Sequence, residues 1–472
     1  MEREAIRIAV KAHVAFSVIR IASLFLTVLG FCSSNLKSAK MRLKNMNEKK
    51  EEFMDKKAFI RKWGTLLLLA AGAGIIFQLP YIRETFYPQI QKAMNLTNSQ
   101  MGQLSAGYAA MATLSYFIGG AIADRFSARI LLTVSFIGTG ALGLWFAEFP
   151  PFHVARMIFV LMGISSIITY WSACIKATRA LGTPEEQGRL FGWQEGLRGI
   201  LNALVVFAMT GVYAYFASTR SEVIGAANAI RLCAWVDIII GILNFIFIKD
   251  TKREKNAPGI GKTVVGLFKC LAIPRVWVLV AIIFTAYSVY GLIGYVNTYA
   301  VNYYGLSETM GSTLGGIRYL LQGVGGIIGG FLADKFKSRI KIIIAGCALL
   351  AASFGIYIIL PVNAGLVGAV IVNFFFGLVF IYAVRSQYFA VHQDAGIPME
   401  LSGRVSGIAS ALGYLPDLFM YTLVGGWMDT YGADGFKMTW GYAIAAALLC
   451  IVFCVILSRI IRKKTEITAK ID

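Results

Sequence analysis

Long apolar stretches recur along almost the whole chain, and they restrict it to one class of fold. Each stretch runs to about 20 residues, the length at which a helix crosses the hydrocarbon core of a bilayer. Charged residues make up only 15% of the 472 positions, too few to cover the surface of a soluble protein of this size. The sequence therefore predicts an all-α membrane protein.

The apolar stretches, counted between clusters of charge, predict twelve transmembrane helices. They are Trp63–Tyr87, Gly102–Ala123, Ile130–Glu148, Val154–Cys174, Trp193–Ala217, Ala226–Ile248, Val276–Ala300, Thr309–Ala333, Ile340–Pro361, Gly365–Val384, Val405–Trp427 and Thr439–Ile461. An even number places both ends of this core on the same side of the membrane. Basic clusters follow the even-numbered spans, which indicates a multi-pass protein of the cell (inner) membrane with both core termini in the cytoplasm.

A polar linker at 249–275 is the longest interruption inside the core, and it divides the spans into two halves. We expect an N-terminal six-helix bundle over 63–248 and a C-terminal six-helix bundle over 276–461. The linker itself is expected in the cytoplasm, together with the tail at 462–472.

Residues 1–62 form an N-terminal extension that allows two interpretations. The apolar stretch Val14–Phe31 is either an additional helix or a segment upstream of the true translation start at a later methionine. Arg20 lies near the centre of the stretch, where an arginine is costly in a lone span. The later start is therefore favoured.

The net charge of +20 does not indicate a nucleic-acid-binding protein, because the basic residues lie in short clusters beside the apolar stretches. The seven cysteines are scattered and the three histidines lie far apart, so no metal site or other cofactor is expected. No nucleophile–base pair or nucleotide-binding loop stands out, which argues against an enzyme. The expected partners are the lipid bilayer and a small-molecule substrate, and the expected form is a monomer.

The two halves of the core share an internal repeat. The segment Gly119–Arg129 recurs as Gly329–Arg339, each copy between the second and third span of its half. A second match joins Gly182–Gly192 to Gly396–Gly407. Matches at two equivalent places make chance similarity a poor explanation.

The repeated pattern Gly-Gly-x-x-Ala-Asp-Arg/Lys-x-x-x-Arg resembles the loop motif of the major facilitator superfamily, and the resemblance extends from about Trp63 to the last span. It implies two pseudo-symmetric six-helix bundles that alternate access to a central site. It also implies that the motif loops and the Gly-Arg pairs of the fifth and eleventh spans hold one end of the protein closed. The implied gating residues are Gly119, Asp124, Arg125, Arg129, Arg189, Asp334, Lys335, Arg339 and Arg404. The alternative is a generic topology determinant without a gating role.

Arg83 is the leading candidate for substrate binding. The segment Leu79–Pro88 resembles the first span of the organophosphate:phosphate antiporter family, in which an arginine contacts the substrate phosphate. The segment Trp171–Lys176 is similar to that family's fourth span, without its prolines. The alternative for Arg83 is an interfacial arginine whose side chain reaches the outer headgroups.

The chain departs from that antiporter family in the seventh span. Where the family has a second arginine, this sequence has Val289, so the two-arginine phosphate clamp is not reproduced. Arg318 or Arg385 could take its place. The complete set of candidate substrate-binding residues is Arg83, Trp171, Tyr287, Arg318 and Arg385.

Three further predictions concern polar residues inside the spans. Asp237, in the sixth span, is the candidate coupling residue, because burial disfavours the charged form of a carboxylate; the alternative is a pairing role between helices. Glu195 and Arg198, one helical turn apart, are expected to pair with each other or with the motif loops. The sequence Tyr414–Asp417 contains a proline and predicts a kink in the eleventh span.

Two C-terminal segments, Val384–Ala390 and Gly413–Met420, resemble those of the YihN-like bacterial permeases, which implies no particular substrate. The sequence as a whole predicts a secondary transporter of a small organic anion, such as a sugar phosphate, a sugar acid or a carboxylate. Coupling would be proton symport or anion antiport. The alternatives are a drug/proton efflux antiporter and a non-transporting membrane sensor.

Overall fold

The computed structural model describes residues 56–183, 186–249, 260–388, 390–397 and 399–468. The chain divides into two compact units, residues 1–62 and 63–472, and the arrangement below is that of the second unit. Both interpretations of the N-terminal extension concern residues outside the described part. Residues 250–259 of the linker also lie outside it.

The described backbone consists of helices joined by short turns. The first half contains α2 (Lys56–Ile75), α3 (Arg83–Met94), α4 (Asn98–Arg125), α5 (Ala128–Phe146), α6 (Phe152–Gly163), α7 (Trp171–Arg179), α8 (Gln187–Thr219) and α9 (Glu222–Phe247). The second half contains α10 (Ile260–Lys269), α11 (Pro274–Leu292), α12 (Tyr295–Tyr303), α13 (Glu308–Phe336), α14 (Arg339–Ile359), α15 (Val367–Tyr388), α16 (Val391–Asp394), α17 (Met399–Gly413), α18 (Met420–Tyr431) and α19 (Ala433–Thr468).

Ten helical stretches of the described residues are long and apolar enough to cross a membrane, and they coincide with the predicted spans three to twelve. The first two predicted spans correspond to α2 with α3 and to α4, which are not among those ten. Large apolar side chains such as Ile327, Phe331 and Ile359 are exposed on the outside of the bundle. Such a surface is stable against lipid and not against water.

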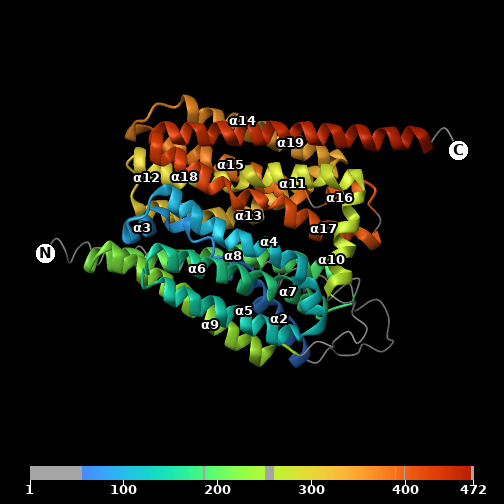
Figure 1. Ribbon diagram of the computed structural model, residues 1–472, viewed down its shortest axis with the longest axis horizontal. Coiled ribbons are helices and arrows are strands. Elements are labelled where there is room, and N and C mark those ends of the chain that lie inside the picture. Colours follow the sequence, from blue (N-terminus) through green and yellow to red (C-terminus); the bar gives the residue numbers. More distant parts are fainter. Residues whose placement is uncertain (1–55, 184–185, 250–259, 389, 398, 469–472) are drawn as a thin grey trace, which may run out of the picture. The chain divides into compact units, whose positions relative to one another are not determined.

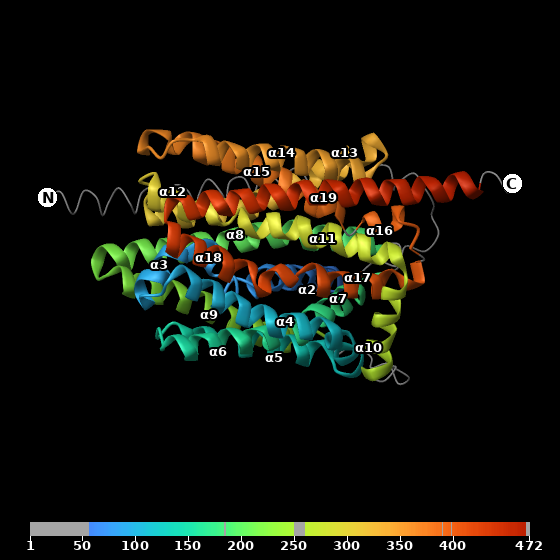
Figure 2. The same cartoon turned by 45° about the horizontal axis from the view of Figure 1, so that its top comes forward.

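The helices of each half pack in the same pattern, as the sequence repeat predicts. In the first half α5 packs on α9 and α4 on α6, and in the second α14 packs on α19 and α13 on α15. Two crossed contacts then join the halves, α8 with α13 and α18 with α4. Figures 1 and 2 show the blue-to-green helices and the yellow-to-red helices as two groups that meet along these contacts.

The repeated glycines allow the close helix contacts that the motif predicts. A Cβ atom on Gly119 would lie 3.3 Å from the carbonyl oxygen of Ile168, and one on Gly329 would lie 2.7 Å from that of Ala383. Each contact joins the second and fourth spans of its half. A side chain at Gly329 would therefore push α13 away from α15.

Four spans are interrupted, the fourth of them by the π-helical stretch Ile164–Ile168 between α6 and α7. Turns separate α2 from α3 and α11 from α12, and a short 3-10 turn, Leu415–Leu418, separates α17 from α18. Pro416 lies in that turn, which confirms the kink predicted for the eleventh span. Polar side chains at or beside these breaks, such as Gln78, Glu84 and Asp417, are buried in the interior.

A central cavity closed at one end

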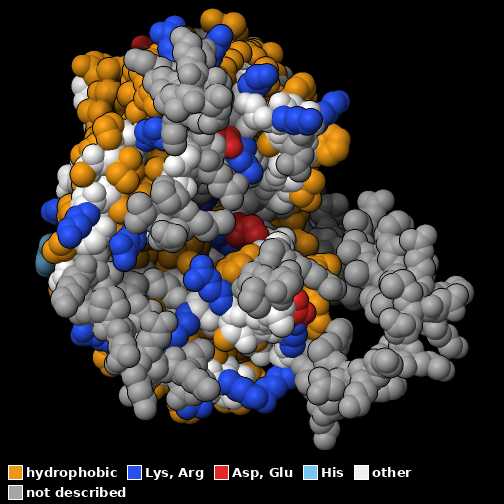
Figure 3. Space-filling model, turned by 90° about the vertical axis from the view of Figure 1, so that its right-hand side faces the viewer, with side chains coloured by type: hydrophobic (Ala, Val, Ile, Leu, Met, Phe, Trp, Pro, Cys, Tyr) orange, Lys and Arg blue, Asp and Glu red, His pale blue; other side chains and the backbone are white. Residues whose placement is uncertain are grey.

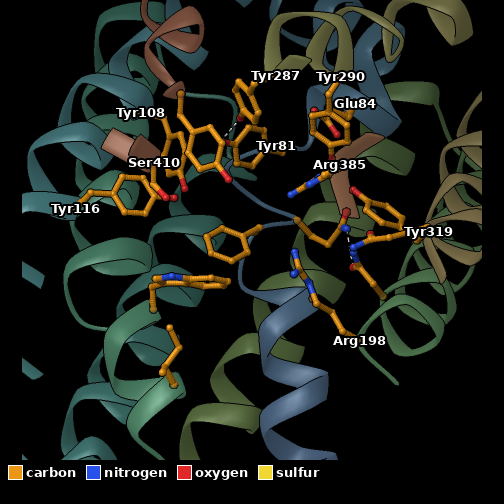
Figure 4. A pocket seen from close by; sticks show the side chains of 18 of the residues that line it. Tyr81, Glu84, Tyr108, Tyr116, Arg198, Tyr287, Tyr290, Tyr319, Arg385 and Ser410 are labelled. Carbon is orange, nitrogen blue, oxygen red and sulfur yellow. Dashed lines mark hydrogen bonds between the residues drawn. The ribbon is translucent and has the colours of Figure 1, made fainter. Parts of the chain in front are cut away.

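A cavity of about 330 Å³ lies between the two halves. Its wall is formed by Gly74, Phe77, Gln78, Tyr81, Glu84, Tyr108, Tyr116, Trp171, Ile175, Arg198, Asn202, Tyr287, Tyr290, Tyr319, Gln322, Arg385, Ser406, Ser410 and Tyr414. Both halves contribute, as Figure 4 shows for the labelled residues. A cavity of this size is comparable with the sites that hold small organic molecules.

The two ends of the bundle are named here as follows. The motif end is the end at which α4 and α13 terminate, and the gate end is the end at which α4 begins and α18 terminates. The cavity extends from the middle of the protein toward the motif end. Arg198 lies in the half of α8 nearer that end, Arg385 lies in the last turn of α15, and Ser406 lies early in α17. Figure 3 looks onto the motif end and shows basic side chains spread across it.

Two arginines reach the cavity from opposite halves. Arg198 forms an ion pair with Glu195, with 3.2 Å between Nη1 and Oε1, so the predicted pair is present. Glu195 also accepts a hydrogen bond of 3.0 Å from Gln322 Nε2 of the other half. Arg385 lies over the ring of Tyr290 at 4.2 Å, and no ion pair to it occurs within the described residues. Figure 4 shows both guanidinium groups directed into the cavity, so its wall attracts anions.

A buried ion pair lies at the deep end of the cavity wall. Glu84, from the first half, lies 3.0 Å from Arg318 Nη1 of the second half, and the two side chains are 5% and 1% exposed. Arg318 Nε also donates to the hydroxyl of Tyr382 at 3.2 Å. Glu84 neutralises Arg318, so the excess positive charge of the cavity wall lies with Arg385.

The remaining wall is aromatic and amide-rich. The rings of Tyr287 and Tyr414 lie 4.3 Å apart, and Gln78 Nε2 donates to Asn202 Oδ1 at 2.6 Å. Trp171 extends the aromatic surface nearer the motif end. Hydroxyl and amide groups of this kind can hydrogen-bond a polyhydroxylated molecule, and the rings can cover its apolar faces.

The structure brings three of the five predicted substrate-binding residues to the cavity, namely Trp171, Tyr287 and Arg385. Arg318 contacts the wall through Glu84. Arg83 lies outside the cavity, because its guanidinium carbon is 3.2 Å from the ring centroid of Tyr421. Arg83 is only 6% exposed, which rules out the interpretation of an arginine that extends to the headgroups.

The predicted gating residues lie at the motif end. The side chains of Asp124, Arg189 and Asp334 fall outside the described part, and those of Arg125, Lys335 and Arg404 are exposed. Arg339 pairs with Asp394 at 2.6 Å within its own half. Arg129 lies over the ring of Phe245, also within its own half, and Gly119 forms the close contact described above. Their gating role stays a prediction.

Asp237, the candidate coupling residue, lies away from the cavity. It is fully buried in α9, and neither carboxylate oxygen has a hydrogen-bond partner within the described residues. Its coupling role also stays a prediction.

Several wall residues were missed by the sequence analysis. Gly74, Gln78 and Tyr81 follow one another at helical spacing in the first span, and in the fifth span Asn202 lies one helical turn after Arg198, which the sequence had singled out as a partner of Glu195. A polar stripe on an otherwise apolar helix indicates a face turned away from lipid. That periodicity could have identified these residues, whereas the choice of single ionisable residues did not.

The gate end is closed by polar contacts between the halves. Lys92 forms an ion pair with Glu308, and Tyr213 donates to the other oxygen of Glu308 at 2.7 Å. The hydrogen bond to Glu308 raises the pKa of Lys92, so the pair persists above neutral pH. Gln89 Nε2 donates to Ser312 Oγ at 2.8 Å.

Asp429 adds a second closure of the gate end. Its carboxylate accepts hydrogen bonds from the backbone N–H groups of Asn98 and Ser99, at 2.8 and 2.7 Å, and from the Asn98 amide. Asp429 therefore caps the first turn of α4 from the opposite half. This position is favourable for a carboxylate, because helix N-termini carry unpaired N–H groups and partial positive charge.

We expect Asp429→Ala to open the gate end more often. Loss of an N-cap costs about 1 kcal/mol, or roughly fivefold in the ratio of open to closed gate. The readout is the rate at which a membrane-impermeant maleimide labels Ser105→Cys, since Ser105 is buried on α4 just behind the gate. Asp434→Ala is the control, because Asp434 pairs with Lys437 of its own helix. Equal labelling of Asp429→Ala and Asp434→Ala would contradict a gate function for Asp429.

Comparison with known sequences agrees with the geometry. The family model described as Major Facilitator Superfamily matches residues 63–420. The inner membrane protein YqcE of Escherichia coli (strain K12) is 32% identical over 417 residues, which cover 85% of this chain and 96% of YqcE. The inner membrane protein YihN of the same strain is 27% identical over 419 residues, 87% of this chain and 98% of YihN.

A more distant relative has a named substrate class. The hexuronate transporter of Bacillus subtilis (strain 168) is 23% identical over 401 residues, which cover 78% of this chain and 88% of the relative. Among solved structures, a bacterial homologue of the human lysosomal transporter Spinster, in an inward-facing and unoccupied conformation, aligns with a TM-score of 0.66 at 14% identity and covers 88% of this chain and 99% of its own. The chain is thus a small-molecule transporter, not an enzyme, and it belongs to the Major Facilitator Superfamily.

Proposed function

We propose that the protein is a secondary active transporter that moves a small organic anion by alternating access, coupled to protons or to exchange with another anion. The observation that carries the proposal is the pair of arginines, Arg198 and Arg385, that face one cavity from opposite halves. A positively charged side chain inside a membrane span is energetically unfavourable unless it is paired with an anion. A cation in a cavity wall therefore indicates that the cavity binds an anion.

The wall also favours an anion that carries hydroxyl groups. Arg385 presents a planar set of donors that can bind two oxygens of a carboxylate or phosphate. Gln78 and Asn202 offer amide groups, and Tyr287 offers a ring and a hydroxyl. A sugar acid or a sugar phosphate uses all of these groups, and the relation to a hexuronate transporter supports the sugar acid.

The proposed orientation places the motif end in the cytoplasm. Exposed basic side chains at that end, such as Arg125, Lys335, Lys337 and Arg404, support it through the positive-inside rule. The cavity would then be that of an inward-facing state, with the gate end closed toward the outside. In the opposite state, the repeated motif loops with Asp124 and Asp334 would close the motif end.

The test is thermal unfolding of the purified protein with a panel of D-glucuronate, D-gluconate, D-glucose 6-phosphate, succinate and cationic drugs. A ligand at about a hundred times its Kd stabilises the folded state by about 2.7 kcal/mol. We expect stabilisation by one or more of the anions and its loss in Arg385→Gln. Arg231→Gln is the matched control, since Arg231 pairs with Glu148 at 2.8 Å away from the cavity.

Two outcomes would replace the proposal. Stabilisation by cationic drugs that is indifferent to Arg385→Gln would favour the efflux antiporter. Stabilisation by an anion without any uptake into proteoliposomes would favour the membrane sensor.

A further inference from the structure

Asp417 is a buried carboxylate to which the proposed function gives no role. It lies in the 3-10 turn between α17 and α18 and is 3% exposed. Its Oδ2 atom accepts hydrogen bonds from the hydroxyl of Tyr287 at 2.8 Å and from that of Tyr81 at 3.0 Å. Its Oδ1 atom is buried and has no hydrogen-bond partner within the described residues.

The two tyrosines join Asp417 to both halves and to the cavity. Tyr81 belongs to the first span, whereas Tyr287 and Asp417 belong to the seventh and eleventh. Tyr81 and Tyr287 both line the cavity, so their hydroxyls connect the carboxylate with it. The carboxylate therefore holds the halves together at the level where they must separate when the protein changes state.

The groups that face Asp417 leave its negative charge without a direct partner. They are Tyr81, Arg83 and Glu84 of the first span, Tyr108 and Tyr116 of α4, Tyr287 of α11, Tyr295 of α12 and Tyr421 of α18. Arg83 and Glu84 have opposite charges, and no ion pair to Asp417 occurs within the described residues. Arg83 instead lies on the ring of Tyr421.

A buried carboxylate of this kind has a hydrogen-bond arrangement that depends on its protonation. As an anion it accepts bonds from both tyrosines. A protonated carboxyl group is a weaker acceptor and carries a donor of its own, so the bridge between Tyr81 and Tyr287 weakens. Binding of one proton would thus loosen a contact between the halves without any change in the fold.

We propose that Asp417 is the proton-binding site that couples transport to the proton gradient, and this inference rests on the proposed function. In the state described here the carboxylate is ionised, and the bridge favours a closed gate end. In the opposite state Asp417 takes up a proton from the gate side. After the protein returns, the proton leaves along the tyrosine hydroxyls to water in the cavity, and the bridge forms again.

The experiment measures the distance across the gate end at different pH values, without any substrate. Spin labels are attached to Thr219→Cys and Val362→Cys, two exposed positions of opposite halves at that end. The six native cysteines in the described part are buried, which limits background labelling. Between roughly pH 8 and pH 5, the wild-type background should pass from mainly short to mainly long distances.

Substitutions then assign the pH response to one carboxylate. Asp417→Asn, which mimics the protonated group, should show long distances at every pH. Asp237→Asn is the matched control, because Asp237 is also buried in a span but, within the described residues, no hydrogen bond joins its carboxylate to the cavity wall; it should respond as the wild type does. Tyr287→Phe removes one donor to the ionised group and should shift the midpoint upward by about one pH unit.

Three results would overturn the inference. They are a wild-type distance that does not change with pH, a response of Asp417→Asn equal to that of the wild type, and a response that Asp237→Asn abolishes. If Asp417 had only a structural role, its substitution would change the label distance by the same amount at every pH and leave the pH response in place. Tyr287→Phe gives an independent readout if Asp417→Asn does not fold. Because no substrate is present, these results are separate from the anion-binding test of the proposed function.

Discussion

Arg318→Met is expected to destabilise the folded protein by about 3–5 kcal/mol, because it leaves Glu84 buried without its partner. The two side chains are 5% and 1% exposed, and 3.0 Å separates Glu84 Oε2 from Arg318 Nη1. The arginine also lies at 4.7 Å over the ring of Tyr290. The measurement is the free energy of unfolding of the purified protein. A second measurement is the fraction of the protein that remains monodisperse after heating.

The double variant Glu84→Gln with Arg318→Met separates the charge from the packing. Without an unpaired charge, we expect it to recover most of the lost stability, since a buried pair replaced by neutral groups of similar size is often near neutral in effect. Equal destabilisation by the single and double variants would show that packing, and not the ion pair, is what Arg318 contributes.

Gly102→Leu is expected to prevent closure of the gate end. A Cβ atom on Gly102 would lie 2.3 Å from the carbonyl oxygen of Tyr421, a backbone atom of the opposite half that cannot turn away. Overpacking of this kind costs about 1–3 kcal/mol even where neighbours can adjust. The protein can avoid the clash by separating α4 from α18, so we expect a fall of about tenfold or more in the closed population.

The label pair at Thr219→Cys and Val362→Cys measures that population directly, and long distances should dominate in Gly102→Leu. The matched control is Gly211→Leu, since Gly211 is exposed on α8 and a Cβ atom there has no neighbour within 4 Å. Short distances in Gly102→Leu would contradict the view that α4 and α18 form the closed gate.

The fold was accessible from the sequence because its signals repeat. The motif at Gly119 returns at Gly329, and the matching helix pairs of the two halves pack alike. Pro416 predicted the break at Leu415–Leu418. Helix length and proline position are local properties, and the bilayer leaves few ways to arrange them.

The site was harder to predict from the sequence, because it depends on contacts between spans that are distant in the chain. Arg83 was a sound candidate as an ionisable residue within a span, yet Tyr421 covers its guanidinium in this state. Nothing local to Arg83 reveals that contact. Arg385 and Tyr287 were identified and do line the cavity, whereas Asp417 was considered only for its place in a kink.

The roles of the charged residues in the spans could not be inferred without knowing their contact partners. Glu84 stands beside Arg83 in the sequence, but its partner in space is Arg318 of the eighth span. Arg198 was expected to pair with Glu195 and does so, while it also reaches the cavity. An ionisable residue in a span indicates a function by its cost, but its role follows only from the three-dimensional contacts.

Uptake of radiolabelled D-glucuronate, D-gluconate and D-glucose 6-phosphate into proteoliposomes tests the central claim most directly. We expect the wild-type protein to take up at least one of these anions, and Arg385→Gln to lower the initial rate by roughly a hundredfold, the loss expected for a charge-assisted pair of hydrogen bonds. Arg231→Gln should transport as the wild type does. Wild-type rates in Arg385→Gln, or uptake of cationic drugs in place of all three anions, would contradict an anion site in this cavity.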